Sequence, residues 1–293
     1  MINGVLLLDK PAGLTSNAAL LRARRALGSK KACHAGTLDP FATGLLVIAL
    51  GGATRWLRFA LTSDKAYRAR VCLGQTTDTG DCDGAIVQKR DVCVTNRDVE
   101  QVLAQFRGVI RQRPPAYSAI KHAGRRLYDY ARAGIEVDVP EREVTIRTLE
   151  FGGRVQNLVD ITVVASKGTY IRSLAEQIGA ALGCGAHLAQ LRRLASGAFQ
   201  VRDAISLGEL LDAPSAAAVM DERVLLQGLP QVCLDSVSAL SFSNGAAVAL
   251  EHADGEVAVS APGGQLLGVG AVAGGRLAPH RVVPGALDLL EHS

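Results

Sequence analysis

The sequence is most distinctive at His34-Ala35-Gly36-Thr37-Leu38-Asp39-Pro40-Phe41-Ala42-Thr43-Gly44, which packs an imidazole, hydroxyls and a carboxylate between glycines. An apolar run over residues 45–50 follows directly. Glycine and proline at this density predict a turn-rich loop. Because Asp39 stands before Pro40, where an aspartate commonly caps a turn or the next helix, the residues alone leave its role open between structural and reactive.

On either side of this loop, helix and strand signals mix through the first 228 residues. Residues 5–9 predict a short strand, and residues 65–73 predict another strand with arginines on one face. Thr95 and Asp98 resemble a capping box at the start of a helix. Other expected elements are a helix that begins at Thr15, Ser16 or Asn17 and stops at Gly28, strands over 144–151 and 155–165 with a hairpin at Gly152-Gly153, and a helix over 174–182.

The character of the chain changes near residue 229. Beyond it, turn signals recur about every ten residues, a spacing typical of a small β-barrel or sandwich, at Asn244-Gly245, Asp254-Gly255, Gly263-Gly264 and Gly274-Gly275. Residues 1–228 carry 30 Lys and Arg against 22 Asp and Glu, whereas residues 229–293 carry 2 against 6. We therefore expect two domains, 1–228 and 229–293, with a polyanionic partner for the basic first domain.

Composition and missing motifs exclude several protein classes. With 48% hydrophobic and 20% charged residues, the 293-residue chain has enough apolar material for a folded core. Its six cysteines lack metal-ligand spacing, which argues against a zinc site and a disulfide framework. The sequence also lacks a phosphate-binding loop, a dinucleotide fingerprint, a signal peptide and an apolar run of membrane-spanning length. We expect a cytoplasmic protein that uses no cofactor and no metal.

The loop is one of a series of motifs that together resemble the TruB family of tRNA pseudouridine synthases. They stand in order between residues 10 and 194, as Lys10-Pro11-Ala12-Gly13-Leu14-Thr15-Ser16, the loop itself, Asp64-Lys65-Ala66-Tyr67-Arg68, residues 74–81, residues 112–121, Ser166-Lys167-Gly168-Thr169-Tyr170-Ile171-Arg172 and Leu191-Arg192-Arg193-Leu194. The resemblance implies an α+β (mixed α/β) fold whose catalytic domain has a central, mostly antiparallel sheet flanked by helices. The C-terminal piece is similar to the PUA domain, a small RNA-binding β-barrel.

The resemblance also implies an activity, the conversion of uridine 55 in the T-loop of tRNA to pseudouridine without a guide RNA. It assigns three catalytic residues, with Asp39 as the nucleophile and Arg172 as its ion-pair partner. Tyr67 is the ring that stacks on the target base, and its phenol is a candidate to move the C2′ or C5 proton. Contacts to the RNA are implied for His34, Tyr67, Tyr170, Leu191, Lys10 and Lys121, although the two lysines could equally make structural ion pairs. Attack by Asp39 at C1′, attack at C6 of the base and a glycal route all remain open.

Two positions depart from the family pattern. Cys33 stands where a glycine usually precedes the histidine, and Val47 stands where a proline is common. Both flank the loop and neither is a reacting group, so these departures concern the local geometry of the loop and not its chemistry.

Three other interpretations compete with this one. The first is a non-catalytic tRNA-binding protein or folding chaperone, and the second is a guide-RNA-dependent relative of the box H/ACA class. The third is a glycoside hydrolase, which would need a second acid beside Asp39, and the resemblance assigns no such role to any acid of the matched motifs. We expect a monomer that binds the T-arm of tRNA and no membrane.

Overall fold

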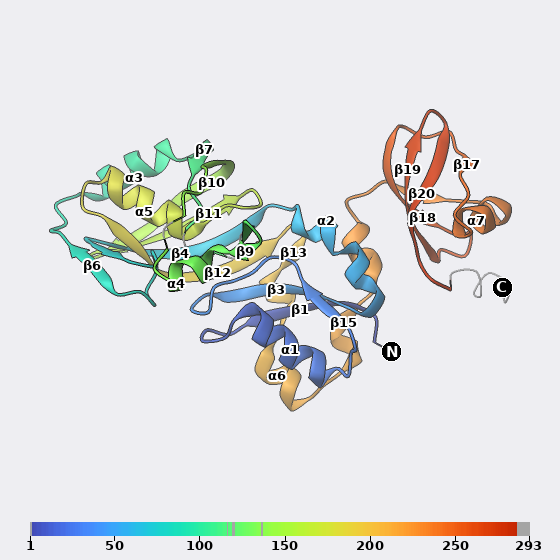
Figure 1. The fold of residues 1–293 in the computed structure, drawn as a ribbon, viewed down its shortest axis with the longest axis horizontal. Coiled ribbons are helices and arrows are strands. Elements are labelled where there is room, and N and C mark those ends of the chain that lie inside the picture. Colours follow the sequence, from blue (N-terminus) through green and yellow to red (C-terminus); the bar gives the residue numbers. More distant parts are fainter. Residues whose placement is uncertain (1, 116, 119–120, 136, 286–293) are drawn as a thin grey trace.

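The computed structural model of the chain describes residues 2–115, 117–118, 121–135 and 137–285. A large sheet crosses the molecule, and a smaller sheet lies at the C-terminal end (Figure 1). In the described residues the large sheet has eleven strands, with the order β14-β1-β3-β12-β4-β11-β10-β7 and with β2, β13 and β15 at its sides. The pairs β1–β14 and β3–β12 are parallel and the other pairs of this sheet are antiparallel. The expected α+β fold with a mostly antiparallel central sheet is confirmed.

The strands of the large sheet are β1 (Gly4–Lys10), β2 (Ala32–His34), β3 (Thr43–Leu50), β4 (Lys65–Leu73), β7 (Gly108–Gln112), β10 (Arg142–Val155), β11 (Leu158–Ala165), β12 (Ala186–Ser196), β13 (Phe199–Gln200), β14 (Ile205–Ser206) and β15 (Val219–Met220). The helices beside it are α1 (Ser16–Ala26), α2 (Leu57–Leu61), α3 (Asn96–Gln105), α5 (Ile171–Ala181) and α6 (Leu207–Asp212), with short 3-10 turns η1 (Gly51–Trp56), η2 (Val201–Asp203), η3 (Ala216–Ala218) and η4 (Glu222–Leu226).

Two pairs of helices cover one face of this sheet. α1 and α6 pack on β1 and β3 in one apolar cluster, and α3 and α5 pack on β4, β10 and β11 in another. The strand register shows that both clusters lie on the same face. Lys10 pairs with Gly44, Gly44 with Arg193 and Arg193 with Tyr67, and cross-strand partners point to the same side. The row Lys10, Gly44, Arg193 and Tyr67 therefore crosses the sheet between the two pairs of helices.

The opposite face of the sheet joins the C-terminal part of the chain. Its apolar side chains share one buried cluster with Trp56 of η1, Leu226 of η4, and Ala258 and Val269 of the smaller sheet. That sheet has the order β16-β18-β19-β20-β17. Its elements are β16 (Gln231–Cys233), α7 (Ser236–Ser243), β17 (Val248–Ala249), β18 (Gly255–Ser260), β19 (Leu266–Ala273) and β20 (Arg276–Val282). These residues form the small β-rich unit that the turn spacing predicts.

Local signals in the sequence account for several element ends. Thr15, one of three cap candidates, is the N-cap of α1, and its side chain accepts the N–H of Ala18 at 3.1 Å. α1 ends at Ala26, two residues before Gly28. The capping box of Thr95 and Asp98 is confirmed at the start of α3.

The expected hairpin is present as β10 and β11, but its turn does not lie at Gly152-Gly153. β10 continues to Val155, and a register shift in its pairing with β11 marks a bulge at the two glycines. A Cβ at Gly152 would lie 3.2 Å from the carbonyl oxygen of Asp160, so this glycine serves the close approach of two strands and not a turn. The chain reverses at Gln156 instead, whose φ is 53°.

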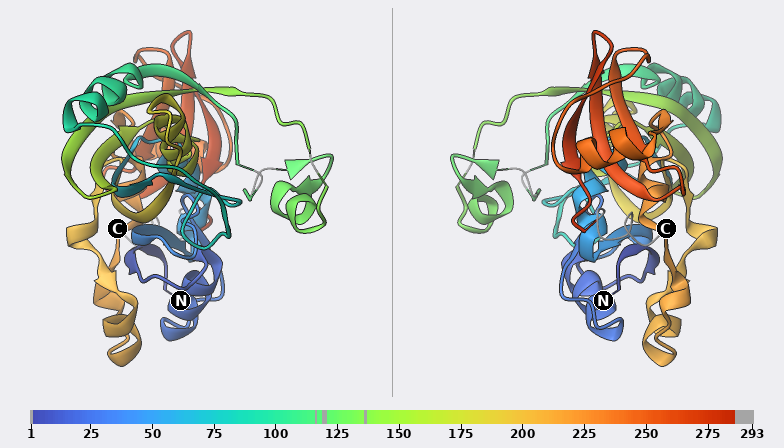
Figure 2. Two further views of the ribbon diagram at one scale, coloured as in Figure 1. Left: turned by 90° about the vertical axis from the view of Figure 1, so that its left-hand side faces the viewer. Right: turned by 90° about the vertical axis from the view of Figure 1, so that its right-hand side faces the viewer.

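Two small hairpins extend from the main body. β5 (Gln75–Thr77) pairs with β6 (Ile86–Lys89), and β8 (Lys121–His122) pairs with β9 (Arg125–Arg126) next to α4 (Leu127–Arg132). Figure 2 shows the segment with α4 projecting from the body on a long connection. Within the described ranges no helix is both long and apolar enough to cross a membrane.

Candidate active site

The loop that carries Asp39 is anchored to the start of α1. The Ser16 hydroxyl, which is buried, donates to the carbonyl of Leu38 at 2.9 Å and accepts the N–H of Leu38 at 2.8 Å. The N–H of Gly13 donates to the carbonyl of Pro40 at 2.8 Å. Because the residues on both sides of Asp39 are bonded to Ser16 and Gly13, the backbone of this nucleophile candidate is fixed by the start of α1 and the segment that precedes it.

Lys10 also holds this loop, so its contacts are of the structural kind, one of the two roles that the sequence left open for it. Its side chain is fully buried and its ammonium donates to the carbonyls of Pro11, Leu14 and Pro40, at 2.8, 2.7 and 3.3 Å. Burial lowers the pKa of Lys10 to about 8, the Asp39 carboxylate opposes this shift, and Arg193 adds to it. All three N–H donors thus face protein oxygens, so Lys10 does not present its charge to a phosphate.

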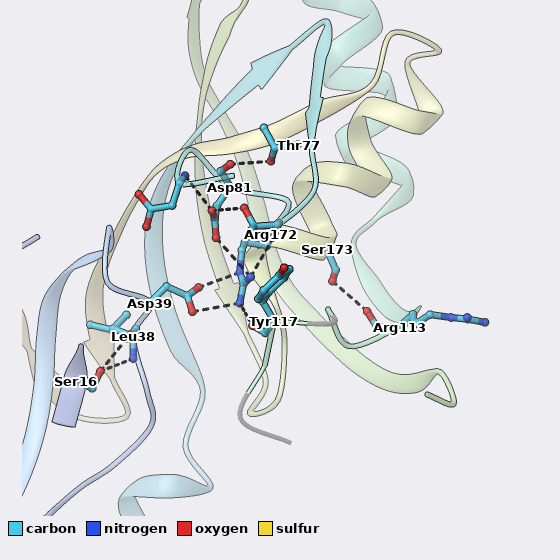
Figure 3. A network of polar contacts seen from close by, with 11 residues as sticks. Ser16, Leu38, Asp39, Thr77, Asp81, Arg113, Tyr117, Arg172 and Ser173 are labelled. Atoms are coloured by element: carbon cyan, nitrogen blue, oxygen red, sulfur yellow. Dashed lines mark hydrogen bonds and ion pairs between the residues drawn. The ribbon is translucent and has the colours of Figure 1, made fainter. Parts of the chain in front are cut away.

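The side chains of Asp39 and Arg172 point toward each other and form an ion pair (Figure 3). Nε of Arg172 lies 3.0 Å from Oδ2 of Asp39, and Nη2 donates to Oδ1 at 3.2 Å. The Arg172 side chain is 4% exposed, whereas the Asp39 side chain is 31% exposed. The guanidinium further donates to the carbonyls of Thr79 and Tyr117, at 3.1 and 2.8 Å. The expected pair therefore forms, and the Asp39 side chain stays partly exposed.

A second carboxylate, Asp81, contacts the same guanidinium. Its Oδ2 lies 3.4 Å from Nη1 of Arg172, and its side chain is 7% exposed. Its Oδ1 accepts the Thr79 hydroxyl at 2.6 Å and the N–H of Asp83 at 3.1 Å. Asp81 stands in the motif at residues 74–81, but sequence reasoning gave it no role, because only the fold brings it to Arg172.

The pKa of Asp39 reflects these neighbours. Burial raises the pKa of the Asp39 carboxyl, Arg172 opposes that shift, Asp81 adds to it, and Lys10 opposes it. Burial likewise raises the pKa of Glu176, a carboxyl one turn along α5 that faces Arg172 and Asp81. The guanidinium is thus shared among several carboxyl groups, and the net effect leaves Asp39 harder to ionise than an ordinary aspartate.

Tyr67 and Arg193 form the middle of the row that crosses the sheet. Tyr67 lies on β4 and is 9% exposed, while Arg193 on β12 is 1% exposed. Arg193 donates to the carbonyls of Leu45 and Gly36, at 2.6 and 3.1 Å. Burial lowers the pKa of Arg193, and the phenol of Tyr67 beside it opposes the shift. Arg193 is therefore a buried residue whose hydrogen bonds join β12 to the loop, and it is not placed to contact a phosphate.

The other candidate residues lie around this centre. His34 ends β2, directly before the loop, and its pKa is lowered by burial and by Arg193, so its ring is neutral at neutral pH. Tyr170 is half-buried at the start of α5, and burial raises the pKa of its phenol. Leu191 is buried on β12. Lys121 lies on β8, and its side chain lies outside the described part of the structure.

A cavity of about 730 Å³ opens beside the loop. Phe41 and Leu191 supply apolar walls, and three arginines on neighbouring strands supply charge, namely Arg68, Arg70 and Arg192. Arg70 and Arg192 are paired with carboxylates, whereas Arg68 is exposed. Among the described residues no group of three or more His, Cys, Asp or Glu side chains could hold a metal ion.

Family models match three consecutive parts of the chain. The first is described as TruB family pseudouridylate synthase, N-terminal domain, and covers residues 24–171. The second is the tRNA pseudouridylate synthase B C-terminal domain, over residues 172–232, and the third is Pseudouridine synthase II TruB, C-terminal, over residues 230–283.

Curated proteins and solved structures are also similar to this chain over most of its length. A tRNA pseudouridine synthase B of Azoarcus sp. strain BH72 is 47% identical over 97% of this chain and 95% of its own length. That of Aromatoleum aromaticum is 48% identical over 97% of this chain and 93% of its own. Among structures, a chain of a Cbf5-Nop10-Gar1 complex is 28% identical with a TM-score of 0.75, over 96% of this chain and 85% of that one. A chain of an H/ACA RNP bound to a substrate RNA containing 2′-deoxyuridine is 26% identical with a TM-score of 0.74, over 97% and 86%.

Proposed function

This chain belongs to the TruB family of pseudouridine synthases, and we propose that it isomerises uridine 55 in the T-loop of tRNA to pseudouridine, without a guide RNA. Isomerisation of uridine in tRNA is the activity of the family. The position in the tRNA, the independence from a guide and the roles of single residues are the proposed part. The residue roles rest on the geometry around Asp39, whereas the position and the independence from a guide rest on the similarity of the chain to the family.

The observation that carries the proposal is the half-exposed carboxylate of Asp39, held by a buried guanidinium. Two nitrogens of Arg172 contact the two oxygens of Asp39, so the carboxylate is held in place while its side chain stays 31% exposed. A carboxylate in a partly dry site is a stronger nucleophile than one in water, and Arg172 keeps it ionised against the effect of burial. Asp39 is therefore the group that attacks the nucleotide.

The reaction needs nothing that the chain does not supply. The N1–C1′ bond of the uridine breaks, the uracil turns within the site, and a bond forms between C5 and C1′. The proton on C5 leaves to solvent and N1 gains one, so no electron is transferred and no group is imported. A covalent adduct with Asp39 holds the reacting centre during the turn, whether it forms at C1′ or at C6. A glycal route uses the same carboxylate.

The target base must leave the RNA stack to reach Asp39. Extrusion of a base costs a few kcal/mol, which contacts in the pocket have to offset. Tyr67 is assigned to stack on the uracil, with Tyr170 and Leu191 as walls of its pocket. His34, neutral and at the mouth of the loop, is assigned to enter the space beside the extruded nucleotide. Lys121 keeps its proposed contact with the RNA, whereas Lys10 positions the loop.

The two-domain division remains part of the proposal. Residues 1–228 would carry catalysis, and residues 229–293 would add RNA contacts as a PUA-like domain. The large cluster shared by the two sheets supports a fixed relation between them. We further propose that the protein acts as a monomer in the cytoplasm, which size-exclusion chromatography with light scattering and cell fractionation would test.

Tritium release from tRNA transcript labelled with [5-³H]uridine tests the reaction and its position together. The purified chain, with no guide RNA and no cofactor added, should release one tritium per tRNA. A transcript in which uridine 55 is replaced by cytidine should release none. Equal release from both transcripts would contradict the assigned position.

The same assay separates the rival functions. A folding chaperone would bind the transcript and release no tritium, and a guide-dependent enzyme would release tritium only after a guide RNA is added. The solved structures of guide-dependent complexes are much less similar to this chain than the curated tRNA enzymes are. We therefore favour the guide-independent reaction.

A further inference from the structure

Gln112 is the last residue of β7 and lies buried beside the start of α5. Its Oε1 accepts the backbone N–H of Tyr170 at 3.0 Å, and its Nε2 donates to the carbonyl of the same residue at 3.3 Å. The residue is 2% exposed. One carboxamide therefore binds both backbone groups of a single residue, as a neighbouring strand would.

Tyr170 is the residue at which α5 begins. It is the N-cap, yet its own side chain makes no capping hydrogen bond. Its carbonyl accepts the N–H of Leu174 at 3.0 Å, which is a bond of the first helical turn. Arg172 follows two residues later. Because a helical turn is rigid, the place at which the Tyr170 backbone is held also sets the place of Arg172.

Other bonds join α5 to the same stretch of chain, but none of them holds the backbone of Tyr170. Gln177 donates to the carbonyl of Arg111 at 2.9 Å and accepts from Gln112 at 3.3 Å. Ser173 donates to the carbonyl of Arg113 at 3.1 Å (Figure 3). These contacts attach the helix, whereas Gln112 fixes the point from which it starts.

We propose that Gln112 is a positioning residue for the isomerisation. By holding the backbone of Tyr170, it places the Tyr170 ring at the base pocket and the Arg172 guanidinium on Asp39. Without the carboxamide, the Tyr170 N–H and carbonyl lose buried partners and the start of α5 shifts. A shift of about 1 Å at a reacting centre costs about 100-fold in rate. This inference rests on the proposed function and deepens it.

The test compares Gln112→Met with Gln177→Met, each of which replaces a carboxamide by an apolar side chain of similar length. Only the first removes the two bonds to Tyr170, whereas the second removes bonds between the same helix and the same strand. Single-turnover tritium release by Gln112→Met should fall about 10- to 100-fold, with tRNA affinity within about 3-fold of wild type. Gln177→Met should stay within about 3-fold of the wild-type rate.

The pH dependence of the rate separates positioning from a general loss of stability. Arg172 opposes the rise in the pKa of Asp39. If Gln112→Met moves Arg172 away, that pKa rises further and the acid limb of the rate profile shifts to higher pH. The acid limb of Gln177→Met should stay in place.

The outcomes separate a failure of this inference from a failure of the proposed function on which it rests. A wild type that releases no tritium overturns the proposed function. An active wild type, with equal rates and equal pH profiles for the two variants, overturns the role of Gln112. If Gln112→Met fails to fold, Gln112→Glu takes its place, because it retains an acceptor for the Tyr170 N–H and loses the donor to the carbonyl. A rate and profile for Gln112→Glu that match Gln177→Met would also overturn the role.

Discussion

Two contact regions of this molecule are held together in opposite ways. Between the two pairs of helices, where Asp39 lies, the contact is polar, and Arg172 is buried among carboxylates and carbonyl groups. Between the large sheet and the C-terminal sheet the buried contact is an apolar cluster that includes Trp56 and Val269. Hydrogen bonds between Arg55 and Val282 and between Arg281 and Arg55 lie beside it. The ion pair at that second contact, Arg58 with Glu256, is exposed, with side-chain exposures of 54% and 35%.

The difference shows at which of the two contacts the fold buries charged side chains. Removing an ion from water costs several kcal/mol, and even a good partner only roughly balances that cost. Attachment alone is better served by apolar area, which stabilises by about 25 cal/mol per Å² buried. Of these two contacts, the one where the reaction needs charge therefore contains the buried charge, whereas the ion pair at the C-terminal sheet is exposed.

The apolar contact can be broken at Trp56, which is 1% exposed and donates through Nε1 to Glu222 at 3.1 Å. Trp56→Ala should lower the free energy of unfolding by about 3–5 kcal/mol, because it leaves a large cavity and an unpaired carboxylate. Urea unfolding measures the change. Tritium release by the folded variant should remain within about 3-fold of wild type, and a loss of stability below about 1 kcal/mol would contradict the account.

The polar contact is tested by Arg172→Lys, which keeps the positive charge and loses the planar guanidinium group. A lysine cannot bind both oxygens of Asp39 together with the carbonyls of Thr79 and Tyr117. We expect kcat to fall about 100- to 1000-fold, with KM for tRNA within about 3-fold. Steady-state tritium release gives both constants. A variant that loses KM and keeps kcat would place Arg172 in RNA binding instead.

The pH dependence of the rate tests the electrostatics of the same contact. The reaction requires ionised Asp39, and burial raises the pKa of that carboxyl. As the pH is lowered, the single-turnover rate should therefore begin to fall at a pH above the ordinary aspartate pKa of about 3.9. Asp81 adds to the shift. Asp81→Asn should therefore move the acid limb to lower pH, and a move to higher pH would reverse the assigned sign.

The smallest effect is expected at the exposed ion pair. Arg58→Ala removes its bond to Glu256, but solvent already screens both partners. The free energy of unfolding should change by less than about 1 kcal/mol, and the rate of tritium release should not change measurably. A loss as large as that of Trp56→Ala would mean that charge, and not apolar area, attaches the C-terminal sheet.

Sequence patterns predicted much of this molecule where the signal is local. The cap at Thr15 and the capping box at Thr95 depend on neighbouring residues, and both are present. The Asp39–Arg172 pair spans 133 residues, and only the resemblance to a family could suggest it. The turn of the hairpin of β10 and β11 was wrongly placed at Gly152-Gly153, because a glycine serves a bulge as well as a turn.

The residues that were missed depend on tertiary contacts. A glutamine after a strand is usually exposed, and Gln112 is buried only because β7 ends against α5. Asp81 stands among turn residues and reaches Arg172 only in the folded chain. The sequence left Lys10 open between a contact to the RNA and a structural role, and only the fold shows its buried ammonium bonded to the carbonyls of Pro11, Leu14 and Pro40.

Replacement of Asp39 by asparagine tests the central claim most directly. Asp39→Asn keeps the shape of the side chain and cannot act as a nucleophile, so single-turnover tritium release should fall at least about 1000-fold. The affinity for tRNA, measured by filter binding, should stay within about 3-fold of wild type. Retention of a tenth or more of the wild-type rate, with binding intact, would contradict the assignment of Asp39 as the attacking group.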